Sequence, residues 1–327
     1  MAKRKQRLKP DIIAKKYWNN NERFADFFNA VLFQGEQVIK PEELEDVDTE
    51  GSFVLEHRKY AESIQAARDN IKVRKRYLAR GVELVMLGNE GQEHIHYAMP
   101  LRVMGYDYGT YKKQYDSNAE NYATAKGLDR DEYLSKMKRT DKFIPVITVV
   151  VYYGEKPWNG ATTLQGMLNI GEEIAPYVND YKILLVEARQ NNLTLHNMSN
   201  VAFFNLLEIL LDENKTTDEI KRKAIEYTEK HEVDRTVVMA VAGVTNNKID
   251  YNILDKRGDS DMCRVFEEMW EEGRREGREE GRAEEIIETG FEFGLPENDI
   301  LERLQDKLNI SLQKAQGYFN RFRKQTV

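Results

Sequence analysis

The feature that most constrains the fold is an apolar run in the middle of the chain, FIPVITVVVYYG at residues 143–154. The run is rich in β-branched and aromatic side chains, and its apolar residues do not alternate with polar ones. A strand of this kind is apolar on both faces, as expected at the centre of a sheet that helices cover on both sides. Strands of similar character are predicted at 82–87 and 181–186. The pattern therefore favours an α/β protein.

Helical patterns surround these strands. Residues 21–33 place apolar side chains on one helix face, with Asn20 or Asn21 as the cap and Gln34-Gly35 as the end. Residues 60–78 are ambiguous between a strand followed by a helix and one long helix, because their charges are dense. The other predicted elements before residue 187 are helices at 106–122 and 163–168 and short strands at 38–39 and 53–55. This order predicts an α/β sandwich with a mixed sheet.

The chain after residue 186 is predicted to be helical. Three helices are expected at 200–211, 217–229 and 237–244. Residues 267–285 then repeat Glu and Arg at helical neighbour spacing, but interior glycines weaken the helix by about 1 kcal/mol each relative to Ala. This segment is interpreted either as an exposed spacer or as a helix through which copies of the chain form a homo-oligomer. Residues 296–323 form a small helical unit whose predicted apolar side consists of Ile300, Leu301, Leu304, Leu308, Ala315, Tyr318, Phe319 and Phe322.

Composition restricts the classes of protein and site. The formal charge of −7 argues against a cationic coat for nucleic acid, although local basic clusters at residues 3–9 and 72–80 are candidates for phosphate contacts. The single cysteine, Cys263, excludes an intramolecular disulfide and zinc sites built from several thiolates. No signal-peptide pattern begins the sequence, and the longest apolar run is too short to cross a bilayer. We expect a cytoplasmic protein without a membrane partner.

A cluster of polar residues follows the predicted strand at 82–87. Glu90 and Gln92 have the i, i+2 spacing that places two side chains on one face of a strand, so they form a candidate metal platform. One carboxylate holds Mg²⁺ poorly, and Asp69 is the best-placed second acid. A helix is expected between Asp69 and Glu90. His94 and His96 repeat the i, i+2 spacing, but no third zinc ligand is evident nearby.

Several of these segments carry a resemblance to a known family. They are RDNIK at 68–72, LGNEGQ at 87–92, IHYAMP at 95–100, PVIT at 145–148 and WNG at 158–160, together with NERFADFFN at 21–29 and the Gly-Arg-Glu-Glu tail. With these motifs the chain resembles the recombination-promoting nuclease or transposase family of bacteria, a branch of the PD-(D/E)XK nuclease superfamily. The resemblance covers roughly residues 17–285.

The resemblance implies a PD-(D/E)XK nuclease-like αβ sandwich, followed by a helical C-terminal extension. The implied divisions are a basic N-terminal tail (1–16), a nuclease-like domain (17–250), a charged helical linker (251–290) and a small helical unit (291–327). Asp69 matches the first acid of the motif and Glu90 the second, whereas Gln92 stands where the superfamily more often has Lys. Because Gln carries no charge, Gln92 could only orient a nucleophile.

The implied activity is that of a metal-dependent DNA endonuclease linked to recombination or mobile elements. Asp69 and Glu90 would hold Mg²⁺, for which Mn²⁺ is expected to substitute, and Gln92 would position the attacking water. Arg102 and Lys72 are expected to bind phosphate, Arg102 through its bidentate fork. Two alternatives stay open: a catalytically weak DNA-binding or self-assembly module, and a nuclease that acts on RNA.

Overall fold

The predicted central strand forms β6 (Val146–Tyr152) of a mixed, five-stranded sheet. The computed structural model describes residues 10–47, 52–57, 60–65, 71–89, 95–122, 127, 129–245 and 262–323. The sheet has the order β1–β4–β5–β6–β7, in which β6 pairs in parallel with β5 and β7 and the other pairs are antiparallel. The other strands of this sheet are β1 (Leu44–Asp46), β4 (Ile71–Tyr77), β5 (Val82–Asn89) and β7 (Leu184–Glu187). The predicted α/β class with a mixed sheet is confirmed.

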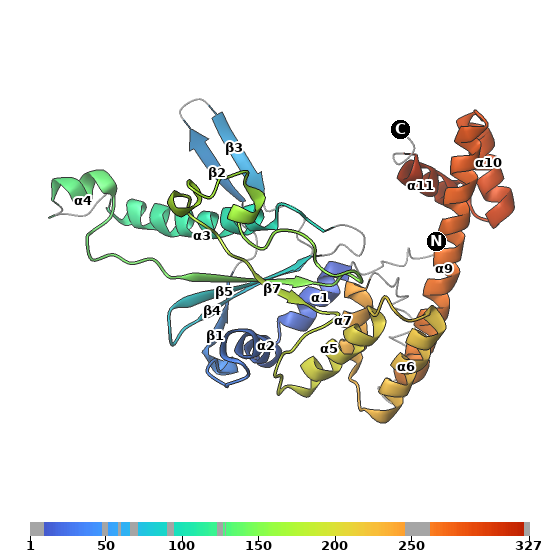
Figure 1. The fold of residues 1–327 in the computed structure, drawn as a ribbon, viewed down its shortest axis with the longest axis horizontal. Helices are drawn as coiled ribbons and strands as arrows, with labels where there is room; N and C mark the ends of the chain where they lie inside the picture. Colours follow the sequence, from blue (N-terminus) through green and yellow to red (C-terminus); the bar gives the residue numbers. More distant parts are fainter. Residues whose placement is uncertain are drawn as a thin grey trace, which may run out of the picture. The chain divides into compact units, whose positions relative to one another are not determined.

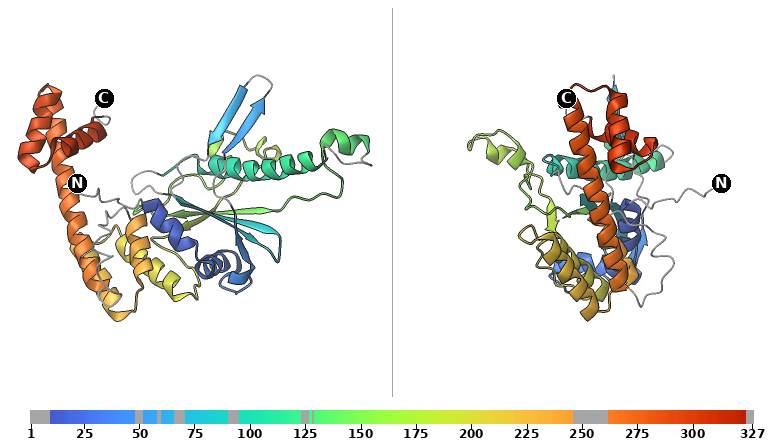
Figure 2. Two further views of the ribbon diagram at one scale, coloured as in Figure 1. Left: turned by 180° about the vertical axis from the view of Figure 1, so that it is seen from behind. Right: turned by 90° about the vertical axis from the view of Figure 1, so that its right-hand side faces the viewer.

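Helices cover both faces of this sheet (Figures 1 and 2). On one face α3 (Met99–Tyr122) packs Met99 and Val103 against Val85 and Val150 of the central strands. The opposite face carries four helices, α1 (Pro10–Trp18), α2 (Asn21–Phe33), α5 (Met198–Leu210) and α7 (Arg235–Val244). The remaining elements of this unit are α6 (Thr217–Lys230), α4 (Arg130–Ser135), the β2–β3 hairpin (Ser52–His57 and Tyr60–Gln65) and the 3₁₀ turns Pro41–Glu43, Gln165–Met167 and Ala175–Tyr177.

Aromatic side chains hold the four-helix face together. Trp18 at the end of α1 is fully buried and lies 5.1 Å from the ring of Phe27 and 5.5 Å from that of Phe203. Tyr153, just after β6, makes an edge contact with Phe203 and so ties α5 to the sheet. Large rings of this kind bury much apolar area, which is the main stabilising term of such a core. The N-terminal helix is therefore part of the folded core.

Several predicted elements differ from the observed ones. Residues 60–78, predicted either as a strand followed by a helix or as one long helix, contain strands at 60–65 and 71–77, and residues 38–39 are not a strand. The segment predicted as a helix at 163–168 contains only a 3₁₀ turn, and α3 begins at Met99, earlier than expected. The boundaries of α2 are as predicted: Asn20 caps its start by accepting a hydrogen bond from the Arg23 N–H, and Gln34 ends it in the left-handed conformation.

The second unit, Asn247–Val327, contains the predicted helical region. Its helices are α9 (Met262–Glu292), α10 (Glu297–Leu308) and α11 (Leu312–Phe322). Ala283 and Ile287 of α9 share one core with Ile300, Leu304 and Phe319, so the end of the charged helix packs with the two helices that follow. The predicted apolar side is buried or partly buried throughout.

Two of the predicted divisions of the chain fall inside helices. The division after residue 16 lies within α1, and the division after residue 290 lies within α9. In both places apolar side chains on the two sides of the division share one core. Among the residues that the structure describes, no helix is both long and apolar enough to span a membrane.

The burial of α1 can be tested with two adjacent isoleucines. Ile13 is 8% exposed and Ile12 is 46% exposed. We expect Ile13→Ala to lower the free energy of unfolding by about 2–4 kcal/mol and Ile12→Ala by less than about 1 kcal/mol, because only the first leaves a cavity. Urea unfolding of the full chain measures both. Equal losses would contradict the packing of α1 in the core.

Candidate functional site

The candidate site lies where the carboxyl ends of β5, β6 and β7 meet. The register places Asn89, Tyr152 and Glu187 beside one another at these ends. The first residue of β4, Ile71, pairs with Gly88 of β5 and therefore reaches the same edge. In sheets with parallel strands, the carboxyl ends are the usual position of ligand and catalytic groups. In the sequence, the predicted site residues precede β4 or follow β5, and both of these strand ends belong to this edge.

Asp69, Glu90 and Gln92 lie outside the described residues. The described ladder nevertheless pairs residues that are close to both acids in the sequence. Asp69 precedes Ile71 by two residues, Glu90 follows Gly88 by two, and those neighbours are ladder partners. The β4–β5 ladder therefore brings the chain neighbours of the two acids together.

The helix expected between Asp69 and Glu90 is absent from the described part of that stretch. Residues 71–89 form β4, a tight turn and β5 instead. The expectation was wrong because it treated the dense charges of 72–76 as a solvated helix face. In the strand, the backbone of these residues pairs with β5, and two of the charged side chains are buried against partners on other segments.

Two cations of the predicted phosphate-binding cluster serve the fold. Arg74 is 6% exposed and forms an ion pair with Glu83, which accepts a hydrogen bond from Arg74 Nε at 2.7 Å. Lys75 is fully buried and donates to the backbone oxygen of Asn19 at 3.1 Å and to Asp46. Removing one member of a buried pair leaves an uncompensated charge, which costs several kcal/mol. Neither cation is available to a phosphate.

The structure describes the side chain of only one of the two predicted phosphate-binding residues, Arg102. Lys72 lies in β4 with its backbone opposite Leu87, and its side chain is outside what the structure describes. Arg102 is half-buried in the first turn of α3, where its guanidinium donates to the Tyr106 hydroxyl at 3.1 Å. This hydrogen bond occupies one nitrogen of the fork and holds the side chain along the helix. An arginine at a helix start adds to the positive end of the helix dipole, which favours anions.

A second carboxylate at this edge was missed by the sequence reasoning. Glu187 ends β7 and accepts hydrogen bonds from the Trp158 backbone N–H at 3.0 Å and from Arg189 Nε at 3.1 Å. Burial, and then the Glu187 carboxylate, raise the pKa of the neighbouring Tyr152 hydroxyl. The signal was present in the sequence, since Glu187 follows an apolar strand in the way that Glu90 does.

The turn after β6 forms one wall of this edge. The ring of Trp158 lies 5.2 Å from that of Tyr152, and its Nε1–H donates to the Gly160 oxygen at 2.8 Å. Gly160 is packed so closely that an added Cβ would lie 3.2 Å from the Ile95 side chain. Ile95 precedes α3 in the sequence and lies against this turn. The turn therefore helps to position the start of α3.

A buried network fixes α3 on the sheet. Asp107 is 6% exposed and accepts a hydrogen bond from Thr148 Oγ1 of β6 at 2.6 Å and another from the Tyr181 hydroxyl. Burial, and then the hydrogen bond to Asp107, raise the pKa of Tyr181 far above its usual value. Both hydroxyls are therefore donors to a carboxylate, and the network is a structural clamp that positions the helix carrying Arg102.

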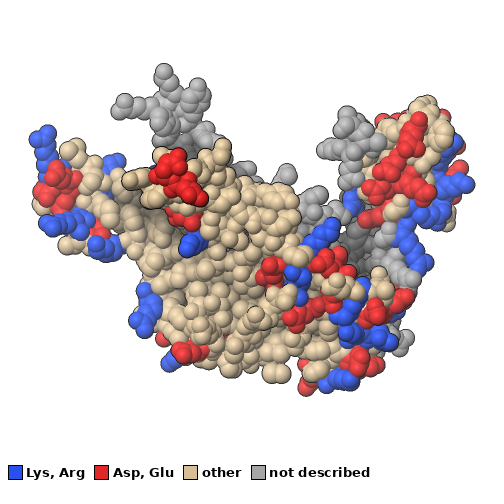
Figure 3. Space-filling view, in the orientation of Figure 1, with Lys and Arg blue, Asp and Glu red and all other residues tan. Residues whose placement is uncertain are grey.

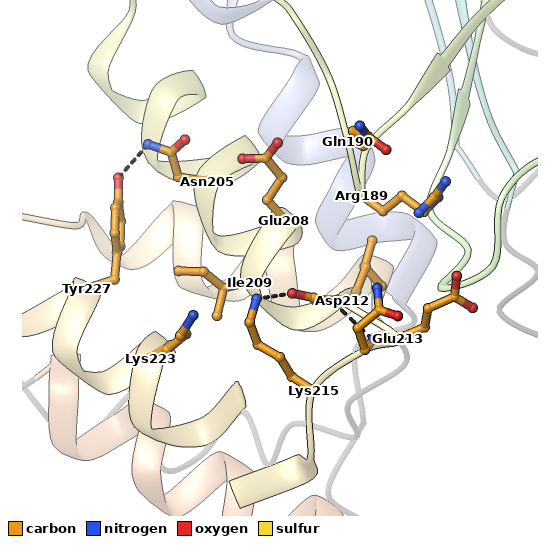
Figure 4. A pocket seen from close by; sticks show the side chains of 12 residues that line it. Arg189, Gln190, Asn205, Glu208, Ile209, Asp212, Glu213, Lys215, Lys223 and Tyr227 are labelled. Carbon is orange, nitrogen blue, oxygen red and sulfur yellow. Dashed lines mark hydrogen bonds and ion pairs between the residues drawn. The ribbon is translucent and has the colours of Figure 1, made fainter. Parts of the chain in front are cut away.

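A pocket of about 490 Å³ lies between the chain after β7, α5 and α6 (Figure 4). Its walls carry both signs of charge, and Lys215 forms an ion pair with Asp212 inside it. Asn205 donates to the Tyr227 hydroxyl at 3.1 Å across another wall. Because the charges are mixed and partly paired, the pocket favours no class of ligand. Arg189 belongs both to its lining and to the strand edge.

The residues proposed for a metal have suitable donor chemistry. Carboxylate oxygens of Asp69 and Glu90 and the amide oxygen of Gln92 are the hard ligands that Mg²⁺ prefers. Within the described ranges, no group of three or more His, Cys, Asp or Glu side chains gathers as a metal site.

No known protein family, curated protein or solved structure matches the chain. Evidence about function therefore comes from the residues themselves.

The Asp107 clamp generates a pH dependence. Because the folded-state pKa of Tyr181 is raised above its unfolded value of about 10, its contribution to stability is complete below about pH 10 and is lost as the pH rises toward the folded pKa. We expect the stability difference between wild type and Tyr181→Phe to be constant from pH 7 to pH 9, by this linkage, and to shrink by up to about 1.4 kcal/mol per pH unit above pH 10. Urea midpoints across this range measure it. A difference that stays constant above pH 10 would contradict the clamp.

Proposed function

We propose that the chain is a metal-dependent endonuclease that hydrolyses DNA phosphodiester bonds, with its active site where the carboxyl ends of β5, β6 and β7 and the start of β4 meet. The observation that carries the proposal is the β4–β5 ladder, which pairs Ile71 with Gly88 and so brings the chain neighbours of Asp69 and Glu90 together. The resemblance to recombination-promoting nucleases supports the same two acids. It also favours DNA recombination or mobile-element processing as the context.

Asp69 and Glu90 would hold Mg²⁺, and Mn²⁺ would substitute for it. When bound, such an ion lowers the pKa of a coordinated water and polarises the phosphate. Gln92 would accept a hydrogen bond from the attacking water and orient it. Because its amide carries no charge, Gln92 would not neutralise the developing oxyanion, and we expect turnover to be slow.

Two described arginines lie near this edge and carry the positive charge that an anionic substrate needs. Arg102 stands in the first turn of α3 and Arg189 follows β7. On the face seen in Figure 3, Lys and Arg side chains lie in clusters mixed with Asp and Glu. A broad area without charged side chains (tan) lies between these clusters. Binding of a phosphate backbone would therefore rest on a few local cations, and its affinity should fall steeply with salt.

A plasmid-nicking assay tests the proposal. We expect supercoiled DNA to be nicked with Mg²⁺ or Mn²⁺ and not with EDTA. The isosteric variants Asp69→Asn and Glu90→Gln should each lower the rate at least about 100-fold, because each removes a metal ligand. Glu155→Gln is the matched control, since Glu155 is an exposed acid that follows β6, and it should nick like wild type.

Metal-dependent nicking that both acid variants retain would contradict the assignment of the site. Nicking absent with either metal would contradict the proposed activity. A single-stranded RNA oligonucleotide in the same assay separates a DNA-directed enzyme from an RNA-directed one, and preferential cleavage of the RNA would also contradict the proposal.

A further inference from the structure

The C-terminal unit contains two helices joined by a short turn. Helix α10 ends at Leu308, and α11 begins at Leu312. Asn309 ends α10 in the left-handed conformation (φ 52°), and Ser311 caps α11 by accepting a hydrogen bond from the Lys314 N–H. Left-handed backbone at the turn lets the chain reverse direction within three residues. A turn of this length occurs both in αα-hairpins and in the helix-turn-helix motif.

Packing fixes which side of α11 faces outward. Ala315, Tyr318, Phe319 and Phe322 are buried in the core shared with α9 and α10. On one flank Lys314 and Arg321 form ion pairs with Glu279 and Glu280 of α9, at 2.5 Å and 3.0 Å respectively. The Tyr318 hydroxyl also donates to Glu279, at 2.9 Å. The helix is therefore held against α9 in one rotational setting.

The side turned away from the core is a stripe of uncharged residues, which we call the amide stripe. It consists of Gln313, Gln316, Gly317 and Asn320, all exposed and spaced i, i+3, i+4 and i+7. Within the part of the chain that the structure describes, no side-chain hydrogen bond to these three amides is found. An added Cβ at Gly317 would meet nothing within 4 Å. Packing thus does not require this glycine, although it weakens the helix relative to Ala.

The chemistry of the amide stripe matches the edges of DNA bases. Gln and Asn side chains form bidentate hydrogen bonds with adenine in the major groove, and a residue without a side chain allows close approach of the helix. Cations follow Asp306 in the sequence without further Asp or Glu. They are Lys307, Lys314, Arg321, Arg323 and Lys324, of which Lys314 and Arg321 form the ion pairs with α9.

We propose that α11 is a recognition helix that enters the major groove of duplex DNA and reads bases through Gln313, Gln316 and Asn320. Arg323 at the end of α11 and Lys307 at the end of α10 would contact the phosphates on either side of the groove. This binding site is separate from the strand edge of the α/β unit. It would select the DNA sequence at which the chain acts, a role that the proposed hydrolysis does not itself include.

The test uses the full chain in EDTA, so that no metal-dependent cleavage occurs. Selection from a pool of duplexes with a randomised centre should enrich a preferred sequence that contains A·T pairs. Fluorescence anisotropy with that duplex then compares two isosteric variants that each add one negative charge to the same unit. Gln316→Glu lies on the amide stripe, whereas Asn298→Asp lies on the exposed first turn of α10.

We expect Gln316→Glu to weaken binding at least about 10-fold and Asn298→Asp to bind like wild type, because only the first opposes base edges. Because binding is measured in EDTA, this result is independent of the nicking assay. Equal affinities for Gln316→Glu and wild type would overturn the proposal, and so would a selection that enriches no sequence. A shift in sedimentation of Gln316→Glu without a change in DNA affinity would assign the stripe to a second copy of the chain instead.

Discussion

Backbone hydrogen bonds between β4 and β5 join residues 71–77 to residues 82–88, and the rest of the α/β unit is built around that ladder. The paired strands bury Arg74 against Glu83 and Lys75 against the backbone oxygen of Asn19, which follows α1. The contacts of these charged side chains, as well as the burial of apolar area, therefore depend on the register of β4 and β5. A shift of one residue would turn these cations to the opposite faces, where their partners are missing. The same register pairs the start of β4 with the end of β5, at Ile71 and Gly88.

The sequence allowed the elements with strong local patterns to be predicted. The continuous apolar run of β6 and the capped, periodic helix α2 are decided by residues within each segment, and both formed where expected. Strand β4 could not be predicted in the same way. Its charged residues suggest a solvated helix, and what makes them acceptable in a buried strand is the pairing of Arg74 with Glu83 and of Lys75 with Asn19, contacts that form only in the folded chain.

At the candidate site, too, features set by neighbouring residues could be predicted, whereas contacts between distant segments could not. Polar groups after a buried strand were recognisable from the sequence, and the strand edge to which they lead is formed by three neighbouring strand ends. Glu187 was missed because its position beside Tyr152 depends on the parallel pairing of β6 with β7. The Asp107 clamp on α3 was also beyond reach, since its donors, Thr148 and Tyr181, belong to segments far along the chain. Charge alone was misleading, because the basic run at 72–80 contributes two cations to the core.

The central claim is that Asp69 and Glu90 act together as ligands of one divalent ion at the β4–β5 edge. Mn²⁺ binding, followed by loss of the free-ion signal in electron paramagnetic resonance, tests it without relying on catalysis. If the two acids share one ion, wild type should bind Mn²⁺, and Asp69→Asn and Glu90→Gln should each lose most of the affinity. The double variant should lose little more, because the effects of two ligands of one ion are not additive. Binding that survives in both single variants, or losses that add in the double variant, would contradict a shared site.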